Sequence, residues 1–211
     1  MIRVLLADDH AIVRTGLKEI LESTGEIVVA AEASNGHEAL AAARGQDFDI
    51  AVLDLSMPGR SGIELIKLIK AERPKLRILV LSMHSEEQYA VRAVRAGASG
   101  YLTKETATEA LVAAVRRIAG GGAYISPETA ERLVLDSSAG AEGPPHKRLS
   151  DREYEVFRMI VAGNSITDIA ASLNLSVKTI STHKARMLEK MGLGSQAELV
   201  RYAVEHDLTE D

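Results

Sequence analysis

Polar residues suited to phosphoryl and metal chemistry stand at the ends of several apolar segments. Asp54 follows the run Ala51 to Leu53 in the stretch 50–62, IAVLDLSMPGRSG, which then breaks at turn residues. A short apolar run bounded by turn residues predicts a buried strand, so Asp54 is expected at the carboxyl end of a parallel strand. In open α/β sheets, ligands bind at that edge. A lone aspartate there more often caps a helix or stays solvated, so its meaning depends on its neighbours.

Three further segments are predicted to end at the same edge of the sheet. Segment 2–7 precedes an acidic pair, segment 76–81 precedes a hydroxyl, and segment 100–102 precedes a hydroxyl and an amine: Asp8, Asp9, Ser82, Thr103 and Lys104. Carboxylates suit a divalent cation, and an amine and a hydroxyl suit the oxygens of a phosphoryl group. The pattern therefore indicates a site that holds a cation and a phosphoryl group on Asp54.

Four motifs carry a resemblance to a known domain. The runs DDH at 8–10, LDLSMPG at 53–59, LSMH at 81–84 and GYLTK at 100–104 resemble the receiver domain of two-component response regulators in order and spacing. The resemblance implies that Asp54 accepts a phosphoryl group from a sensor histidine kinase. It also implies a Mg²⁺ cofactor, with the ligands Asp8, Asp9, Asp54 and the backbone carbonyl of Ser56.

The same resemblance assigns roles around the phosphoryl group. Lys104 and Ser82 would each contact a phosphoryl oxygen, and Ser82 and Tyr101 would form the switch, since movement of Ser82 vacates space for the Tyr101 ring. Ser56 and His84 would tune the lifetime of the acyl phosphate. Alternatives remain open: Asp8 as a helix cap, Tyr101 as a core aromatic and His84 as a surface residue.

The composition limits the function classes. The 211 residues allow one or two domains, and a hydrophobic fraction of 46% suffices for a core. The chain has no cysteine, which excludes disulfides, thiolate metal sites and cysteine nucleophiles. A start without a signal-peptide pattern and the lack of ~18 consecutive apolar residues predict a cytoplasmic protein without membrane partners. The net charge of −5 argues only mildly against nucleic acid, because docking needs local charge.

Periodicity predicts an α/β doubly wound five-stranded parallel sheet, a flavodoxin-like receiver, followed by a small all-α domain of four helices. Apolar positions such as Ile12, Leu17 and Ile20 outline the first helix. We expect the receiver at 1–121 and a helix-turn-helix domain at 148–211. Residues 122–147 between them are expected to hold a connecting helix at 128–135 and a flexible linker at 136–145.

The third helix of the second domain, which begins after Ser176, has two different sides. Val177, Ile180 and Met187 are predicted to pack, whereas small and basic residues follow helical spacing on the other side. Such a face can enter the major groove of DNA. An ordinary solvated face is the alternative. The candidates for phosphate or base contacts are Lys178, Thr179, Ser181, Thr182, His183, Lys184, Ala185 and Arg186.

The run 148–193 resembles the LuxR-type helix-turn-helix domain along its whole length, and a receiver followed by this domain is the arrangement of the NarL/FixJ family. The resemblance implies a transcriptional regulator that binds double-stranded operator DNA as a homodimer, with RNA polymerase as a further candidate partner. Leu199, Val200 and Ala203 are predicted to form an apolar strip for pairing. Many relatives carry longer side chains at the positions of Ser181 and Ala185, so fewer direct contacts to base edges are expected here.

Two other functions are open. A phosphatase with an aspartyl intermediate would need a second carboxylate as general acid, and Ser56 stands two residues after Asp54 instead. Alternatively, the receiver is a protein-docking module and DNA binding is independent of phosphorylation. We therefore expect a phosphoacceptor with only slow autodephosphorylation rather than an enzyme.

Overall fold

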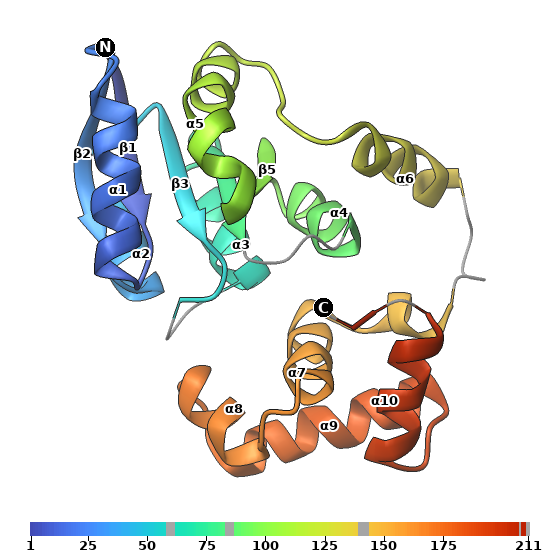
Figure 1. Cartoon of the computed structure of the whole chain (residues 1–211). Coiled ribbons are helices and arrows are strands. Elements are labelled where there is room, and N and C mark those ends of the chain that lie inside the picture. Colours follow the sequence, from blue (N-terminus) through green and yellow to red (C-terminus); the bar gives the residue numbers. More distant parts are fainter. Residues whose placement is uncertain (58–61, 83–86, 139–143, 207, 210–211) are drawn as a thin grey trace. The chain divides into compact units, whose positions relative to one another are not determined.

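The computed structural model describes residues 1–57, 62–82, 87–138, 144–206 and 208–209 (Figure 1). By the density of internal contacts the chain divides into two compact units, residues 1–133 and 134–211. Each unit is described by itself.

The first unit is built on a five-stranded sheet in which every strand pair is parallel. The strands are β1 (Ile2–Ala7), β2 (Ile27–Ala33), β3 (Ile50–Asp54), β4 (Arg77–Ser82) and β5 (Gly100–Thr103), in the order β2-β1-β3-β4-β5. All residues of β3 are buried, as expected for a central parallel strand covered on both faces. The doubly wound fold predicted from the alternating pattern is confirmed.

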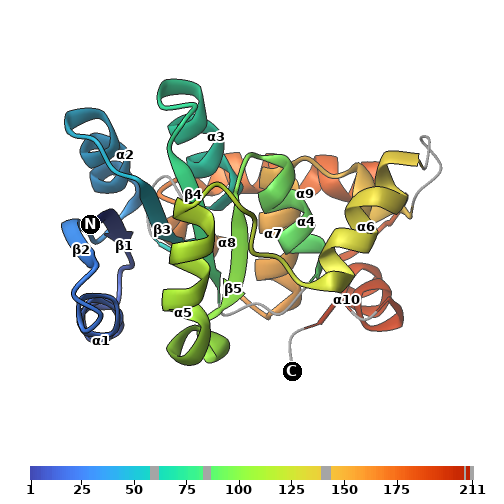
Figure 2. The ribbon, with the colours of Figure 1, turned by 90° about the horizontal axis from the view of Figure 1, so that it is seen from above.

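Helices cover both faces of this sheet. Two lie on one face, α1 (Ala11–Glu22) and α5 (Lys104–Ala119), and three on the other, α2 (Gly36–Gly45), α3 (Gly62–Glu72) and α4 (Glu87–Arg95) (Figure 2). Leu17 and Leu21 of α1 and Leu111 of α5 pack on the sheet as part of one core. Ile12, one of the apolar positions that outline this helix in the sequence, does not pack on the sheet, because the residue is 89% exposed.

The free edge of β5 is covered by the segment that follows α5. The Tyr101 N–H donates to the Tyr124 carbonyl at 2.9 Å, and the Tyr124 N–H donates to the Ser99 carbonyl at 3.0 Å. A Cβ on Gly100 would lie 2.8 Å from the Tyr124 carbonyl oxygen, closer than real Cβ contacts come. Only glycine therefore lets this segment lie along β5. After it, α6 (Pro127–Ser138) begins with Ser126 as a cap, whose Oγ accepts from the Thr129 N–H at 3.0 Å.

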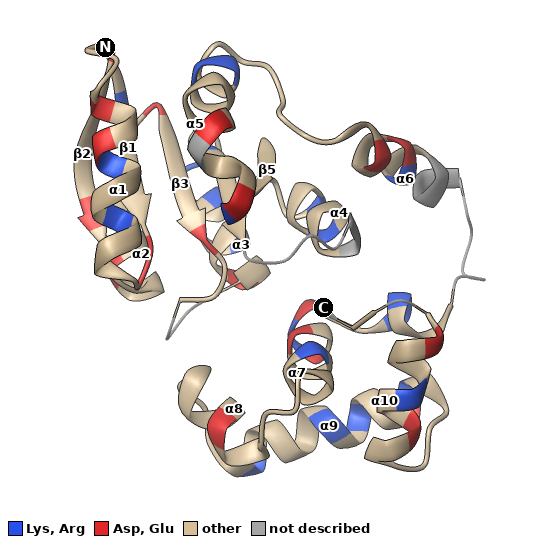
Figure 3. Cartoon of the chain, in the orientation of Figure 1, with Lys and Arg blue, Asp and Glu red and all other residues tan. Residues whose placement is uncertain are grey.

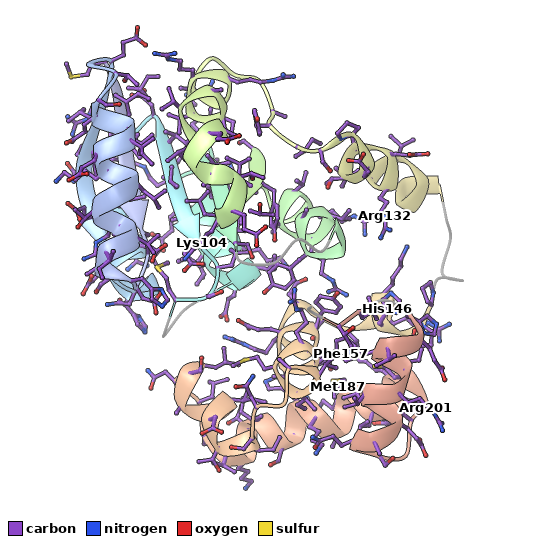
Figure 4. All side chains as sticks on the ribbon, viewed as in Figure 1. Lys104, Arg132, His146, Phe157, Met187 and Arg201 are labelled. Carbon is purple, nitrogen blue, oxygen red and sulfur yellow. The ribbon has the colours of Figure 1, made fainter. Side chains whose placement is uncertain are left out.

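The second unit is helical in its described part. After the last residues of α6, which reach into this unit, the elements are η1 (Pro145–Arg148), a 3₁₀ turn, and four α-helices, α7 (Asp151–Val161), α8 (Ile166–Ser172), α9 (Val177–Met191) and α10 (Gln196–Glu205). Phe157 of α7 and Met187 of α9 are fully buried between these helices (Figure 4). Ser150 and Glu153 form a capping box at the start of α7.

A tight turn sets the start of α9. Asn174 has a φ of 53°, the left-handed geometry that an asparagine side chain tolerates. Ser176 caps α9 by accepting from the Thr179 N–H at 3.0 Å, and Gly192 ends the helix in a left-handed conformation.

Two predictions about packing in this unit are wrong. Val177, the first residue of α9, is 48% exposed rather than packed. Leu199 and Ala203 of α10 are fully buried within their own unit, so they are not available for pairing with a second chain. The large apolar residue that α10 does expose is Val204, at 59%.

Among the described residues, no helix has both the length and the apolar character needed to cross a bilayer.

Candidate functional site

The carboxylate of Asp54 meets the amine of Lys104 at the carboxyl edge of the sheet. Asp54 ends β3 and is fully buried, and the first residue of α5 is Lys104, whose Nζ donates to Asp54 Oδ2 at 2.7 Å. Figure 4 labels Lys104 at this edge. The other oxygen of Asp54 accepts from the Ser56 N–H at 2.9 Å. The two oxygens are thus held by a fixed cation and a backbone donor.

The acidic pair after β1 joins this cluster. Lys104 Nζ also lies 2.8 Å from Asp8 Oδ2, and the His10 N–H donates to Asp8 Oδ1 at 2.8 Å. One ligand atom each of Asp8, Asp9, His10 and Asp54 lies within 4.8 Å of the other three. The chain segments that carry these groups are far apart in sequence, and the order of the parallel strands brings them together.

The donor set fits a hard divalent cation. Asp8 Oδ2 lies 2.8 Å from Lys104 Nζ and Asp9 Oδ1 lies 3.0 Å from His10 Nδ1, and neither buried oxygen accepts a hydrogen bond from any other described residue. Buried carboxylate oxygens in this state retain lone pairs for a cation, and Mg²⁺ takes a few such oxygens together with water. The cluster is therefore compatible with the Mg²⁺ that the sequence predicted.

Burial and charge compete in setting the protonation of this cluster. Burial raises the pKa of the Asp54 carboxyl, and the charge of Asp8 acts in the same direction, while the Lys104 and Ser56 donors act against both. Burial alone would lower the pKa of Lys104, but its hydrogen bonds to Asp54 and Asp8 and their charges outweigh that effect and raise it. Lys104 is therefore an ammonium at neutral pH and supplies fixed positive charge.

The hydroxyl and the aromatic residue lie on the neighbouring strands. Ser82 ends β4, is fully buried and pairs in register with Thr103 of β5. Tyr101 is half-buried and borders a cavity of about 900 Å³, which Thr103, Thr106 and Tyr124 also line. The cavity gives the Tyr101 ring room to change position. His84 lies outside the described residues.

The predicted contact face of α9 is a continuous exposed surface. Lys178, Ser181, Thr182, Ala185 and Arg186 are all exposed. Figure 3 shows the Lys and Arg positions along α9 in blue. The hydroxyls of Ser181 and Thr182 donate to carbonyls one turn earlier, at 2.8 and 2.9 Å, which leaves their lone pairs facing outward as acceptors. The helix thus presents small acceptors between two cations.

Three other candidates on α9 are half-buried and are held by the protein itself. Lys184 Nζ donates to Gln196 Oε1 at 2.7 Å. The Thr179 side chain faces the capping hydroxyl of Ser176 at 2.8 Å. Burial lowers the pKa of His183, and the charges of Arg152 and Arg186 lower it further. His183 is therefore neutral at neutral pH and cannot attract a phosphate by charge.

Two family descriptions match the chain. "Response regulator receiver domain" matches residues 4–116, and "Bacterial regulatory proteins, luxR family" matches residues 147–203. Relatives of the same arrangement cover the full length: the response regulator UvrY of Escherichia coli K12 is 35% identical over 99% of this chain and 96% of its own. The chain belongs to the NarL/FixJ family of response regulators.

Further relatives and solved structures match this response regulator over nearly its full length. The response regulator GacA of Pseudomonas protegens is 35% identical, with 100% of this chain and 99% of GacA covered. A solved structure of RcsB from Salmonella typhimurium is similar with a TM-score of 0.73 and 32% identity, covering 99% of this chain and 98% of RcsB. Another RcsB structure, bound to a promoter in the presence of the phosphomimetic BeF3-, has a TM-score of 0.68 and 32% identity, covering 95% and 97%. The chain is thus a two-component response regulator with a LuxR-type DNA-binding domain.

Two parts of the response regulator had no role in the sequence analysis. His10 lies at the carboxylate cluster, and the motif DDH places it directly after the acidic pair. His146 of η1 is 98% buried, since its exposed fraction is 2%, and its Nδ1 lies 2.7 Å from the Tyr202 hydroxyl of α10. This contact ties the start of the second unit to its last helix. An isolated histidine in a segment rich in Gly and Pro gives no pattern from which such a contact could be predicted.

Proposed function

We propose that this response regulator accepts a phosphoryl group on Asp54 from a sensor histidine kinase and thereby controls the binding of α9 to operator DNA. The observation that carries the proposal is the contact of Lys104 Nζ with a fully buried Asp54 carboxylate, at 2.7 Å, beside two further carboxylates. A buried carboxylate with a fixed counter-charge and a cation-binding cluster next to it suits phosphoryl transfer, where positioning and charge neutralisation dominate.

In the proposed step, an oxygen of Asp54 forms a bond to phosphorus as the P–N bond of the donor phosphohistidine breaks. The leaving imidazole keeps the electron pair and takes up a proton. Asp8, Asp9, Asp54 and the backbone carbonyl of Ser56 would hold a Mg²⁺, which neutralises phosphoryl oxygens when bound. Lys104 supplies positive charge to another oxygen, and the Ser82 hydroxyl donates to a third.

We propose that Ser82 and Tyr101 transmit the change. Phosphorylation adds charge and strong acceptors at the end of β3, one strand away from Ser82. If Ser82 moves toward the phosphoryl group, the Tyr101 ring can enter the space it leaves. The cavity beside Tyr101 supports this, because it provides a second position for the ring without a change of the sheet.

The output is proposed to be operator binding by a homodimer. Dimers that read two half-sites are the usual form of helix-turn-helix proteins, and an α-helix with small exposed residues fits the major groove. We assign two sets of contacts on α9. The DNA backbone is contacted by Lys178, Thr179, His183, Lys184 and Arg186, and base edges are contacted by Ser181, Thr182 and Ala185. A protein that acts on operator DNA is proposed to work in the cytoplasm, with RNA polymerase as a further candidate partner.

The acceptor assignment is tested by incubating the full chain with Mg²⁺ and a small-molecule phosphodonor. Intact mass spectrometry should detect one added phosphoryl group in the wild type and none in Asp54→Asn. Asp47→Asn is a matched control, because the Asp47 side chain is 93% exposed in the same unit, and it should be labelled like the wild type. Label retained in Asp54→Asn would exclude Asp54 as the acceptor.

A further inference from the structure

His10 brings a nitrogen donor to the carboxylate cluster. Its Nδ1 lies 3.0 Å from Asp9 Oδ1 and 3.6 Å from Asp8 Oδ1. The N–H of His10 donates to Asp8 Oδ1 at 2.8 Å, so the backbone that carries the imidazole is fixed to the cluster itself. The imidazole is therefore held where it faces the same space as the carboxylates.

The imidazole has no structural task that would keep it from this role. His10 is the N-cap residue of α1, but its side chain makes no capping hydrogen bond. The side chain is 66% exposed, whereas that of Asp8 is 1% exposed. His10 thus stands at the open side of the cluster, where a ligand that completes a cation site can adjust without disturbing the core.

The spacing suits two ligands of one ion. Two ligand atoms that each lie about 2.1 Å from an ion are about 3 Å apart when the ligand–ion–ligand angle is a right angle. The 3.0 Å between His10 Nδ1 and Asp9 Oδ1 equals this separation. A hydrogen bond between the two groups would give a similar distance, so the alternative is an imidazole that contacts Asp9 and takes no part in metal binding.

The type of donor atom decides which divalent ion the site binds more tightly. Mg²⁺ takes oxygen ligands, whereas imidazole nitrogen favours first-row transition ions such as Fe²⁺, Co²⁺, Ni²⁺ and Zn²⁺. We propose that His10 is an additional ligand of the cation site and makes the site selective for a divalent first-row transition ion over Mg²⁺. The inference rests on the proposed cation site of the acidic cluster but not on phosphoryl transfer.

Proton NMR of the Co²⁺-loaded full chain without a histidine tag tests the coordination directly. A bound imidazole should give a strongly shifted ring N–H signal that disappears in D₂O. We expect this signal in the wild type and in His37→Ala, and its loss in His10→Ala and in Asp9→Asn. His37 is an exposed histidine of α2 in the same unit, so it controls for surface binding of Co²⁺. Absence of the signal from the wild type, or its persistence in His10→Ala, overturns the proposal.

Calorimetric titration of the same proteins tests the selectivity. His10→Ala should weaken Co²⁺ binding at least about tenfold, the smallest effect expected when a metal-bound imidazole is disturbed, with Mg²⁺ affinity little changed. Equal changes for both ions would contradict a role of the nitrogen donor. Neither titration uses a phosphodonor. If Asp54 is labelled in Mg²⁺ but the Co²⁺-loaded protein lacks the shifted N–H signal, only the His10 assignment is wrong. If the signal is present but Asp54 is not labelled, only the acceptor assignment is wrong.

Discussion

Lys104 Nζ lies 2.7 Å from Asp54 Oδ2 and 2.8 Å from Asp8 Oδ2, so a single ammonium compensates two buried carboxylates. This arrangement places the ammonium in competition with any cation that the carboxylates bind, because both are attracted by the same negative charge. It also identifies the residue whose removal separates cation binding from phosphoryl transfer.

Replacing Lys104 with methionine should change these two properties in opposite directions. Mg²⁺ affinity should rise, since a competing positive charge is removed, and the yield of phosphorylated protein should fall at least about tenfold, since a phosphoryl oxygen loses its counter-charge. Calorimetry and labelling with a small phosphodonor measure the two effects. Lys18→Met is the control, because Lys18 pairs with Glu32 on the surface of the same unit. A parallel loss of both properties would indicate a damaged fold instead.

The switch assignment predicts that Tyr101→Ala separates phosphorylation from its effect. The substitution leaves the N–H of residue 101 in place, and this N–H holds the Tyr124 segment at 2.9 Å. Labelling of Asp54 should therefore stay as in the wild type, while the ratio of DNA affinities with and without phosphodonor should fall toward one. A variant that responds to phosphodonor as strongly as the wild type would make Tyr101 an ordinary core aromatic.

The ion pair between Glu153 and Lys190 should make the stability of the helical unit depend on pH. Glu153 is buried, and burial alone would raise its pKa, but the hydrogen bonds from Lys190, at 2.6 Å, and from Ser150 outweigh burial and lower it. A lowered carboxyl pKa contributes stability that is present above the pKa of the unfolded chain and is lost as the pH falls through that of the folded chain.

Lys190→Met should therefore lower the free energy of unfolding of this unit by about 1 kcal/mol at neutral pH, a modest value because Lys190 is 44% exposed. The difference from the wild type should shrink at acidic pH. Chemical denaturation followed by circular dichroism at several pH values measures it. Lys178→Met should show no such difference, since Lys178 is exposed on the surface of α9. A pH-independent cost of Lys190→Met would point to lost packing instead of lost charge.

The exposed cations of α9 should determine the salt dependence of DNA binding. Lys178→Ala and Arg186→Ala should each weaken binding to all sequences and reduce the slope of log affinity against log salt by about one. Ser181→Ala should leave the slope unchanged, because it removes no charge. Titrations at several salt concentrations with random-sequence DNA provide the slopes. If both charge variants keep the wild-type slope, Lys178 and Arg186 do not contact DNA phosphates.

Several features of the fold and site could be predicted because local pattern determines them. The apolar run before Asp54 required a buried strand, and the parallel sheet then brought Asp54 to the same edge as Lys104, 50 residues later.

The features that sequence reasoning missed depend on contacts between distant segments. Ile12 and Val177 follow helical spacing, but both stand in the first turn of a helix, where no other element covers them. Leu199 lies in an apolar strip whose burial depends on the other helices of its unit. The pairing of Tyr124 with β5 leaves no trace in either segment beyond a glycine at position 100.

The central claim is that phosphorylation of Asp54 controls the binding of α9 to DNA. Operators are selected from random DNA with the wild type, and the affinity of the selected sequence is then measured with and without phosphodonor for the wild type and Asp54→Asn. The account predicts that phosphodonor raises the affinity of the wild type at least about tenfold, a coupling of roughly 1.4 kcal/mol, and leaves Asp54→Asn unchanged. Equal affinities of the phosphorylated and unphosphorylated wild type, or an equal response of Asp54→Asn, would contradict it.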